Sequence, residues 1–388
     1  MTQPAADLFP AKEAAASAQH NTGVLPYQSL RELVRAREIF AVEPIDPDQF
    51  QPASLDLRLG HVAYRVRASF LPGAGATVLE KIQQFGMHEI DLTKGAVLEK
   101  GCVYIVPLME QLALSSRIAG IANPKSSTGR LDVFTRVIAD QATVFDRIDA
   151  GYEGRLYIEI APRTFSILVR KGSRLVQLRL RRGAPSSSAT SLRRLQETCR
   201  LVDVPAGQET IRDDVIGVTL DLSGDPATRL VGFRAKQHTD VIDVDVRQAY
   251  DAADYWDPIQ TKPGIGIILD PDDFYILATK ECVRVPPDHA AEMVAYDTLV
   301  GEFRVHYAGF FDPGFGWNPD GGPGSKAVLE VRSHEVPFVL EHEQTVGWLR
   351  YERLTSIPDR LYGQGIGSHY QAQGLQLGKQ FRPFVAAR

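Results

Sequence analysis

The chain has 388 residues, which is more than one hydrophobic core usually supports, so we expect two domains. With 44% hydrophobic and 23% charged residues it has the composition of a folded globular protein, which excludes an extensively disordered chain. The formal net charge of −5 argues against a protein that coats nucleic acid, but it allows a small anionic ligand held by a few local cations.

The first 23 residues contain no apolar stretch of the kind found in a signal peptide, and we expect a disordered lead-in there. No apolar run approaches the roughly 18 residues that a membrane span requires, so we expect a cytoplasmic protein without a membrane partner. The three cysteines are far apart, and the nine histidines show no HExxH spacing. These spacings predict neither a disulfide framework nor a zinc site.

The elements expected along the chain are mostly strands. Residues 27–39 form the clearest helix, with Leu30, Leu33 and Val34 on one face. Short apolar or alternating runs separated by Gly, Pro or Asp then predict strands; they are "VAYRVRASF", "CVYIVPL", "RLYIEIAP", "FSILVR" and "RLVQLRL". The fold class expected is therefore mainly β, with two sandwich-like or barrel-like domains and few short helices.

An internal repeat supports this division into two domains. Four blocks of the first half recur in the same order in the second half, among them "ASLDLRLG" with "GVTLDLSG" and "RIDAGYEG" with "FFDPGFGW". The alignment pairs Tyr104 with Tyr275 and Glu159 with Glu330. We expect a duplicated domain, with a first copy at 24–183, a linker at 184–212 and a second copy at 213–388.

The run "NPKSSTGR" at 123–130 allows two interpretations. Pro, Ser and Gly readily form a polar turn between strands. Hydroxyl, backbone N–H and cationic groups are also the partners that phosphate oxygens take, which indicates a phosphate-binding loop.

The motifs that follow decide between these interpretations. The ordered set "QPASLDLRLG", "KSSTGR", "RIDAGYEG" with the later Glu159, and "HYQAQG" near the end resembles the dCTP deaminase family of the dUTPase-like superfamily. The resemblance implies two tandem dUTPase-like β domains, with nucleotide sites between subunits. It implies that the triphosphate is bound by Lys125, Ser126, Ser127 and Arg130, which we call the phosphate grip.

The resemblance also implies roles for residues of the first copy. Glu159 stands five residues beyond Gly154, at the position of the family's catalytic glutamate, and Arg147 matches an arginine that lies near that glutamate. Asp149 and Tyr152 match residues that contact the sugar or base. We expect groups between Ile138 and Arg147 to recognise the base.

The second copy has lost some of these features and kept others. Its counterpart of the grip, "AYDTLVGE" at 295–302, has no cation, but it keeps "FFDPGFG", Glu330 and a tail that the family folds over the nucleotide. The tail residues are Tyr362, Tyr370 and Gln373. The grip therefore pairs either with Glu159 of another chain or with Glu330 and the tail of a second copy. We favour Glu159 because Arg147 accompanies it.

The function implied is hydrolysis of dCTP to dUTP and ammonia, which supplies thymidylate synthesis. Mg²⁺ is expected to be held by the triphosphate and not by protein ligands. The alternatives are a dUTP diphosphatase, a bifunctional deaminase–diphosphatase, and a non-catalytic nucleotide sensor. We expect a homo-oligomer with threefold or pseudo-threefold symmetry, no nucleic-acid partner, and dTTP as a candidate inhibitor.

Overall fold

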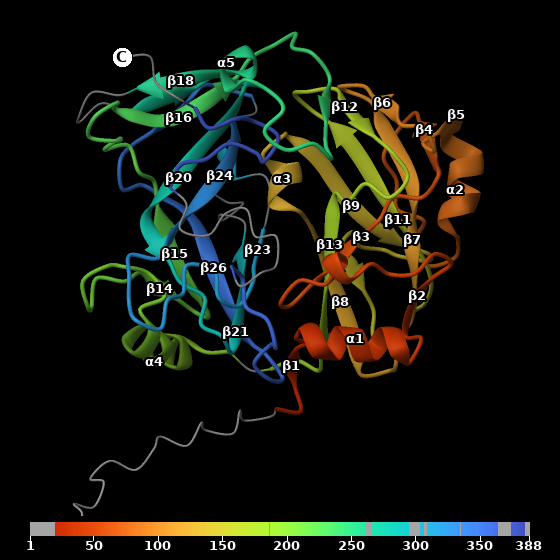
Figure 1. Cartoon of the computed structure of the whole chain (residues 1–388), viewed down its shortest axis with the longest axis horizontal. Coiled ribbons are helices and arrows are strands. Elements are labelled where there is room, and N and C mark those ends of the chain that lie inside the picture. Colours follow the sequence, from red (N-terminus) through yellow and green to blue (C-terminus); the bar gives the residue numbers. More distant parts are fainter. Residues whose placement is uncertain are drawn as a thin grey trace, which may run out of the picture.

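The computed structural model describes residues 20–185, 187–260, 266–294, 303–305, 309–333, 335–363 and 374–384 (Figure 1). The expected lead-in lies outside these residues except for residues 20–23, where Gly23 begins the first strand. The acidic loop at 295–302 and the tail residues Tyr370 and Gln373 also lie outside them. Within the described part of the chain, no helix is both long and apolar enough to cross a membrane.

The first copy is a sandwich of two main sheets. One has the strand order β5-β4-β7-β11-β9 with β2 added to β7, and the other the order β1-β13-β8-β10 with β3 added to β13. The strands are β1 Gly23–Val24, β2 Ile39–Ala41, β3 Leu55–Leu57, β4 Val62–Val66, β5 Gly86–Asp91, β6 Ala96–Leu98, β7 Val103–Ala113, β8 Ile118–Pro124, β9 Val133–Ala139, β10 Arg147–Ile148, β11 Glu153–Pro162, β12 Ile167–Val169 and β13 Val176–Arg182.

The second copy repeats this arrangement. Its sheets have the orders β18-β16-β20-β24-β22 and β14-β15-β26-β21-β23, and a small β19-β25 pair matches the β6-β12 pair. The strands are β14 Ile211–Arg212, β15 Val215–Thr219, β16 Leu230–Ala235, β17 Ile242–Asp243, β18 Trp256–Gln260, β19 Ile267–Leu269, β20 Phe274–Val283, β21 His289–Val294, β22 Phe303–Val305, β23 Phe310–Phe311, β24 Ser325–Ser333, β25 Phe338–Leu340 and β26 Thr345–Arg353.

Individual side chains confirm the duplication. The Tyr104 hydroxyl accepts a hydrogen bond from the Glu99 N–H at 3.0 Å, and the Tyr275 hydroxyl accepts the corresponding bond from the Asp270 N–H at 2.9 Å. The two aligned glutamates also occupy the same register, because Glu159 lies opposite Ile105 on β7 and Glu330 lies opposite Ile276 on β20.

The helices are few and short, as expected. They are α1 Tyr27–Arg35, α2 Val78–Phe85, α3 Ser126–Gly129, α4 Ala189–Cys199 and α5 Ala252–Tyr255, with a 3₁₀ turn, η1, at Pro47–Gln49. The helix predicted at 27–39 ends earlier, because Arg37 adopts a left-handed φ of 60° and Ile39 enters β2. The expected linker contains α4, which Ser188 caps and which buries Leu192 in the second copy's core.

The two copies lie side by side and are packed against each other, with α3 at their boundary (Figure 1). Strand β24 is buried on both faces. Leu329 and Val331 point into the second copy's own core, whereas Val328 belongs to a core cluster shared with the first copy. Because side chains alternate along a strand, Glu330 and Arg332 share the face of Val328, toward the first copy.

Candidate active site

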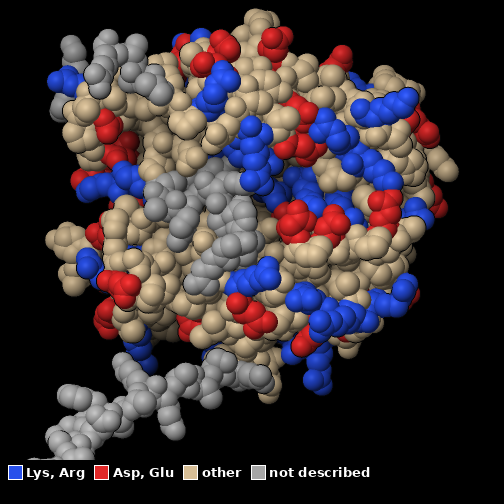
Figure 2. Space-filling model, viewed as in Figure 1, with Lys and Arg blue, Asp and Glu red and all other residues tan. Residues whose placement is uncertain are grey.

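The phosphate grip lies at the boundary between the copies, where it forms the short helix α3 and its flanks. Lys125 precedes the helix, and its Nζ pairs with the Asp56 carboxylate on β3. Ser127 is buried and Ser126 half-buried. Figure 2 shows basic side chains gathered along this boundary. The run "KSSTGR" is thus a cationic turn at an interface between domains.

Arg130 connects the grip to the C-terminal tail. The residue is 2% exposed, and its Nη1 donates to the Gln376 carbonyl oxygen at 2.9 Å. The tail approaches closely at Gly378, where a Cβ atom would lie 2.8 Å from Gln380 Oε1 and 3.7 Å from Arg130 Cβ. A Cβ at position 378 would therefore make an ordinary van der Waals contact with Arg130, and the Gln380 side chain would have to shift.

Glu330 lies on the β24 face that meets the first copy, and it is 6% exposed. Burial raises the pKa of its carboxyl to about 7, because a charged carboxylate loses hydration there, and the positive charge of Arg130 opposes this rise. The structure therefore brings the grip arginine of the first copy near the aligned glutamate of the second.

A buried ion pair fixes this arrangement. Arg332, two residues after Glu330, pairs through Nη2 with the Asp132 carboxylate, two residues after Arg130. Arg332 Nη2 also donates to the Thr164 hydroxyl at 2.7 Å, and that hydroxyl donates to Asp132 Oδ2 at 2.6 Å. Both charged side chains are 5% exposed or less. The pair aligns β24 with the end of the grip.

A second charged contact crosses the boundary at Asp312, the counterpart of Asp149 in "FFDPGFG". Arg179 on β13 donates to Asp312 Oδ1 at 3.3 Å and to the Ala291 carbonyl at 3.0 Å. The Arg179 guanidinium also lies 3.9 Å from the centre of the Phe310 ring. Burial raises the pKa of the Asp312 carboxyl, while the charges of Arg179 and Lys125 lower it.

Glu159 has different surroundings. It is 1% exposed, and its Oε1 accepts hydrogen bonds from Arg136 Nη2 at 2.6 Å and Nε at 3.1 Å. The Arg136 guanidinium stacks over Phe145, 3.7 Å from the ring centre. Tyr157, on the same face of β11, packs in a small cluster with Val78 of α2. Glu159 is therefore paired through Oε1 within the first copy, while its Oε2 is buried and accepts no hydrogen bond from the described residues.

The other predicted residues of the first copy do not gather around Glu159. Arg147 and Asp149 are exposed. The Tyr152 hydroxyl donates to the Arg155 carbonyl at 2.6 Å and accepts from the Asp140 N–H at 3.1 Å, and burial raises its pKa to about 12. The arginine that pairs with Glu159 is Arg136, not Arg147.

The segment predicted to recognise the base, 138–147, lies on the first copy beside Glu159. Within it, Asp146 Oδ1 accepts from the Val137 N–H at 2.7 Å, and burial raises the pKa of Asp146 to about 7. Of the tail residues, Tyr362 is described; it packs against Phe315, with ring centres 5.6 Å apart. This contact places the start of the tail on the second copy.

The described residues contain no group of three or more His, Cys, Asp or Glu side chains arranged to hold a metal ion. The cations in the site are arginine and lysine side chains, which suit phosphate and not metal. A Mg²⁺ ion carried by the nucleotide fits this residue set, because such an ion takes most of its ligands from phosphate and water.

Sequence reasoning missed Arg179, Asp312 and Arg332 at the boundary between the copies, and Arg136 beside Glu159. The internal repeat could have indicated Asp312, since it aligns this residue with Asp149. Arg136 had no such signal, because only the observed pairing of β9 with β11 places it opposite Glu159. Arg179 and Arg332 lie in strand patterns that give no sign of a partner in the other copy.

The comparisons with known proteins agree with this architecture. Residues 21–184 match the family domain described as "2'-deoxycytidine 5'-triphosphate deaminase (DCD) N-terminal domain". Residues 188–381 match the one described as "2'-deoxycytidine 5'-triphosphate deaminase (DCD), C-terminal domain". The crystal structure of 2'-deoxycytidine 5'-triphosphate deaminase from Agrobacterium tumefaciens is similar, with a TM-score of 0.85 and 54% identity, over 90% of this chain and 100% of that one.

Curated relatives are matched over shorter spans. A protein named "dCTP deaminase, dUMP-forming" from Halobacterium salinarum is 38% identical over 114 residues, which are 28% of this chain and 54% of that protein. One of the same name from Mycolicibacterium gilvum is 30% identical over 158 residues, 39% of this chain and 78% of that protein. The chain spans 54% to 58% of the first three curated relatives. The expected family is confirmed: the chain belongs to the 2'-deoxycytidine 5'-triphosphate deaminase family and carries its N-terminal and C-terminal domains.

Proposed function

We propose that this chain hydrolyses dCTP to dUTP and ammonia, in a site formed by the grip of the first copy and Glu330 of the second. The observation that carries the proposal is the placement of Arg130 beside Glu330, both buried at the boundary between the copies. Glu159 is the weaker candidate, because both hydrogen bonds from Arg136 end on its Oε1 and pair the carboxylate within the first copy. The tail reaches Arg130 from the second copy, which also favours Glu330.

Glu330 supplies the proton transfers that deamination requires. Its carboxylate takes a proton from water as the oxygen bonds to C4 of cytosine, and the carboxylic acid then gives a proton to the amino group that leaves as ammonia. A pKa of about 7 suits both steps, since the group is ionised and protonated in comparable amounts near neutral pH.

The grip residues bind the triphosphate. Lys125 offers a point charge, Arg130 a planar set of N–H donors, and Ser126 and Ser127 offer hydroxyl donors. Mg²⁺ enters with the nucleotide and neutralises part of the phosphate charge. Because the grip contacts phosphate and not the base, deoxycytidine without phosphates is a poor substrate.

We assign to Asp312 the role expected of Asp149, that of contacting the sugar or base. It is buried at the same boundary, close enough to Lys125 for that charge to lower its pKa. A bifunctional enzyme that goes on to dUMP is the second candidate, because seven curated relatives are named dUMP-forming, whereas one is named dCTP deaminase alone. Threefold or pseudo-threefold assembly and inhibition by dTTP stay predictions.

The test is to incubate the protein with Mg²⁺ and either dCTP or dUTP, in separate samples, and to resolve dUTP, dUMP, pyrophosphate and ammonia. Ammonia with dUTP supports the deaminase. Ammonia with dUMP and pyrophosphate supports the bifunctional enzyme. Pyrophosphate formed only from dUTP, without ammonia from dCTP, indicates a diphosphatase. If nucleotide stabilises the folded protein but is not turned over, the result would contradict the proposal and favour the non-catalytic nucleotide sensor.

A further inference from the structure

Arg179 of the first copy reaches across the boundary and contacts Asp312 of the second. Its Nη2 donates to Asp312 Oδ1 at 3.3 Å, and both residues are buried, at 1% and 7% exposed. We propose that Arg179 is a positioning residue, which holds the Asp312 carboxylate against the sugar or base of the nucleotide. This inference deepens the proposed function and rests on the role that we assigned there to Asp312.

Arg179 binds the backbone of the two strands that lead to Asp312. Ala291 on β21 and Phe311 on β23 are paired residues, and the guanidinium donates to their carbonyl oxygens at 3.0 Å and 3.4 Å. It also lies over the ring of Phe310, 3.9 Å from the ring centre. Because β23 ends at Phe311 and Asp312 follows directly, these contacts fix the direction in which the Asp312 side chain leaves the strand.

Hydrogen bonds on either side place Asp312 between the grip and the start of the tail. On one side Asn123, at the beginning of the run that contains the grip, donates through Nδ2 to Glu292 Oε1 at 3.1 Å. Glu292 is on β21, which pairs with β23. On the other side the Tyr362 N–H donates at 2.8 Å to the carbonyl oxygen of Pro313, the residue after Asp312. Arg179 therefore acts on a carboxylate that lies within the proposed site.

Arg179 leaves one oxygen of the Asp312 carboxylate available. It binds Oδ1, and none of the described residues donates a hydrogen bond to Oδ2. A carboxylate oxygen accepts hydrogen bonds from a sugar hydroxyl or from the amino group of a base. Held through Oδ1, Asp312 can therefore present Oδ2 to the nucleotide.

Arg179 also balances the negative charge of Asp312. Burial raises the pKa of this carboxyl, and the charge of Arg179 lowers it. Two further groups face it from neighbouring elements: Asp56 on β3 raises its pKa and Lys125 lowers it, and these two are paired with each other. Glu292 on the adjacent strand accepts the hydrogen bond described above. Without Arg179 the pKa of Asp312 would rise further, so the carboxyl would keep its proton to higher pH.

The internal repeat offers a matched control. The alignment of 157–180 with 328–351 pairs Arg179 with Arg350. Arg350 Nε pairs with Asp214 of its own copy at 3.0 Å, and the two side chains are 39% and 31% exposed. Asp149, the counterpart of Asp312, is exposed. The same position therefore forms a surface ion pair in the second copy and a buried contact between copies in the first.

The experiment measures the Kd for dCTP by calorimetry in the E330Q chain, where the proposed base is absent and does not titrate. We expect R179M and D312N each to weaken binding roughly tenfold at neutral pH, as loss of one charge-assisted hydrogen bond does. In a chain that already carries D312N, adding R179M should change the Kd less than about twofold, because Arg179 acts through Asp312. R179K keeps the charge and should recover part of the binding.

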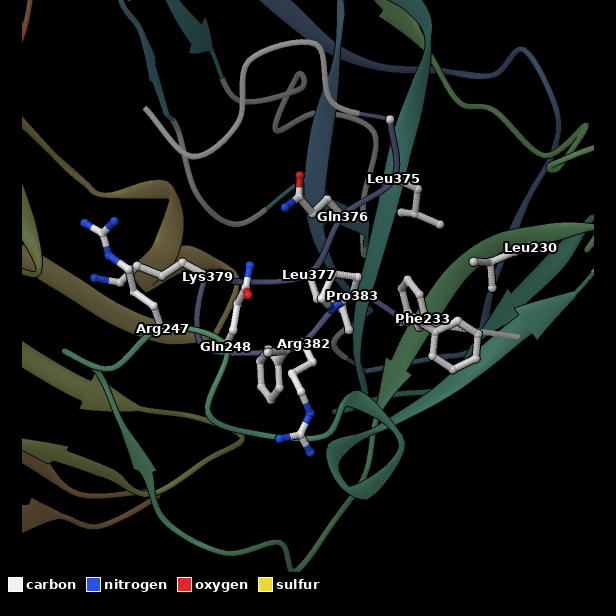
Figure 3. Close-up of a pocket in the computed structure, with 13 residues that line it drawn as sticks. Leu230, Phe233, Arg247, Gln248, Leu375, Gln376, Leu377, Lys379, Arg382 and Pro383 are labelled. Atoms are coloured by element: carbon white, nitrogen blue, oxygen red, sulfur yellow. The ribbon is translucent and has the colours of Figure 1, made fainter. Parts of the chain in front are cut away.

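Two further readouts separate positioning from a general structural effect. Inorganic triphosphate, a probe without sugar or base, should bind R179M within about twofold of the parent chain. The loss of dCTP binding in R179M should also shrink as pH rises, because Asp312 then ionises without Arg179. R350M should leave the Kd unchanged. Neither Arg179 nor Asp312 is among the described residues that line the cavity of about 560 Å³ between β16 and the tail segment 374–384 (Figure 3), so their variants leave that cavity intact.

An unchanged Kd for dCTP in R179M would overturn the inference, as would an equal loss of binding for dCTP and inorganic triphosphate. If R179M does not fold, because Asp312 is left buried without its partner, D312N is compared with R179M/D312N, which removes both charges. A tenfold difference between those two variants would also overturn it. If the inference fails while the wild-type chain releases ammonia from dCTP, the proposed function stands. If R179M behaves as expected but no ammonia appears, the positioning role stands and the deaminase fails.

Discussion

Arg332 of the second copy and Asp132 of the first form a buried ion pair, and each lies two residues from a group that we place in the active site. Asp132 adopts a left-handed φ of 54°, which orients its carboxylate after the turn of the grip. Since Arg332 and Glu330 share one face of β24, the pair sets the position of Glu330 relative to Arg130.

Replacing Asp132 tests this relationship. D132N leaves the Arg332 guanidinium buried without its counter-charge, so we expect a loss of roughly 3 kcal/mol in the free energy of unfolding. The kcat should also fall, because β24 and the grip lose their alignment. Chemical unfolding and ammonia release measure the two effects. The control is K171A, which breaks the exposed ion pair with Glu43. It should lower the free energy of unfolding by less than about 1 kcal/mol. A D132N variant as stable and active as wild type would contradict the assigned role.

The pH dependence of the rate tests Glu330 as the base. Because the ionised carboxylate must accept a proton, kcat/KM should rise with pH and level off above about pH 7, the pKa of Glu330. Asp146 has a similar pKa but lies in the first copy beside Glu159, so D146N should retain the same rise. If the rise in kcat/KM with pH disappears in D146N, the group that titrates is Asp146, and this result would count against Glu330 as the base.

The pH dependence of stability gives an independent readout of the same group. Below its ordinary pKa of 4.5, Glu330 is protonated in both the folded and the unfolded chain. Between that value and about 7 the unfolded chain loses the proton while the folded chain keeps it, so the wild-type protein loses stability as pH rises. E330Q lacks this loss and should gain up to about 3 kcal/mol over wild type between pH 4 and pH 8. Urea unfolding at both pH values measures the difference in free energy of unfolding between E330Q and wild type. If this difference is the same at pH 4 and pH 8, the pKa of Glu330 is not raised.

Arg136 distinguishes a structural Glu159 from a catalytic one. R136M leaves the Glu159 carboxylate buried and unpaired, so we expect a loss of about 2–3 kcal/mol in stability with little change in kcat. The double variant R136M/E159Q should recover part of the lost stability, because the isolated charge is gone. Thermal unfolding and turnover of the folded fraction report the two properties separately. A large fall in kcat in R136M, with the free energy of unfolding unchanged, would indicate that Glu159 is catalytic.

The sequence was sufficient for the fold because its signals are local. Strand alternation and the aligned pairs Tyr104–Tyr275 and Glu159–Glu330 predicted two β copies, and equivalent hydrogen bonds and registers confirm them. Such local patterns do not show how the two copies pack against each other. Whether the grip meets Glu159 or Glu330 depends on which sheet faces pack together, and a strand buried on both faces, such as β24, looks the same in sequence for either arrangement.

Two further features lay outside local sequence patterns. The Ser and Gly residues at 184–212 predicted a linker, and within this segment the structure places a helix that Ser188 caps and that buries Leu192. Arg147 was expected near the catalytic glutamate from the family resemblance, and no sequence pattern indicated Arg136, which the pairing of β9 with β11 places opposite Glu159.

The most direct test of the composite site is ammonia release from dCTP by E330Q and E159Q, each shown by its unfolding curve to be folded. The account predicts that E330Q loses at least about a hundredfold in kcat, as removal of a general base does, while E159Q stays within a few-fold of wild type. Loss of activity in E159Q with activity retained in E330Q would contradict it and place catalysis on the first copy.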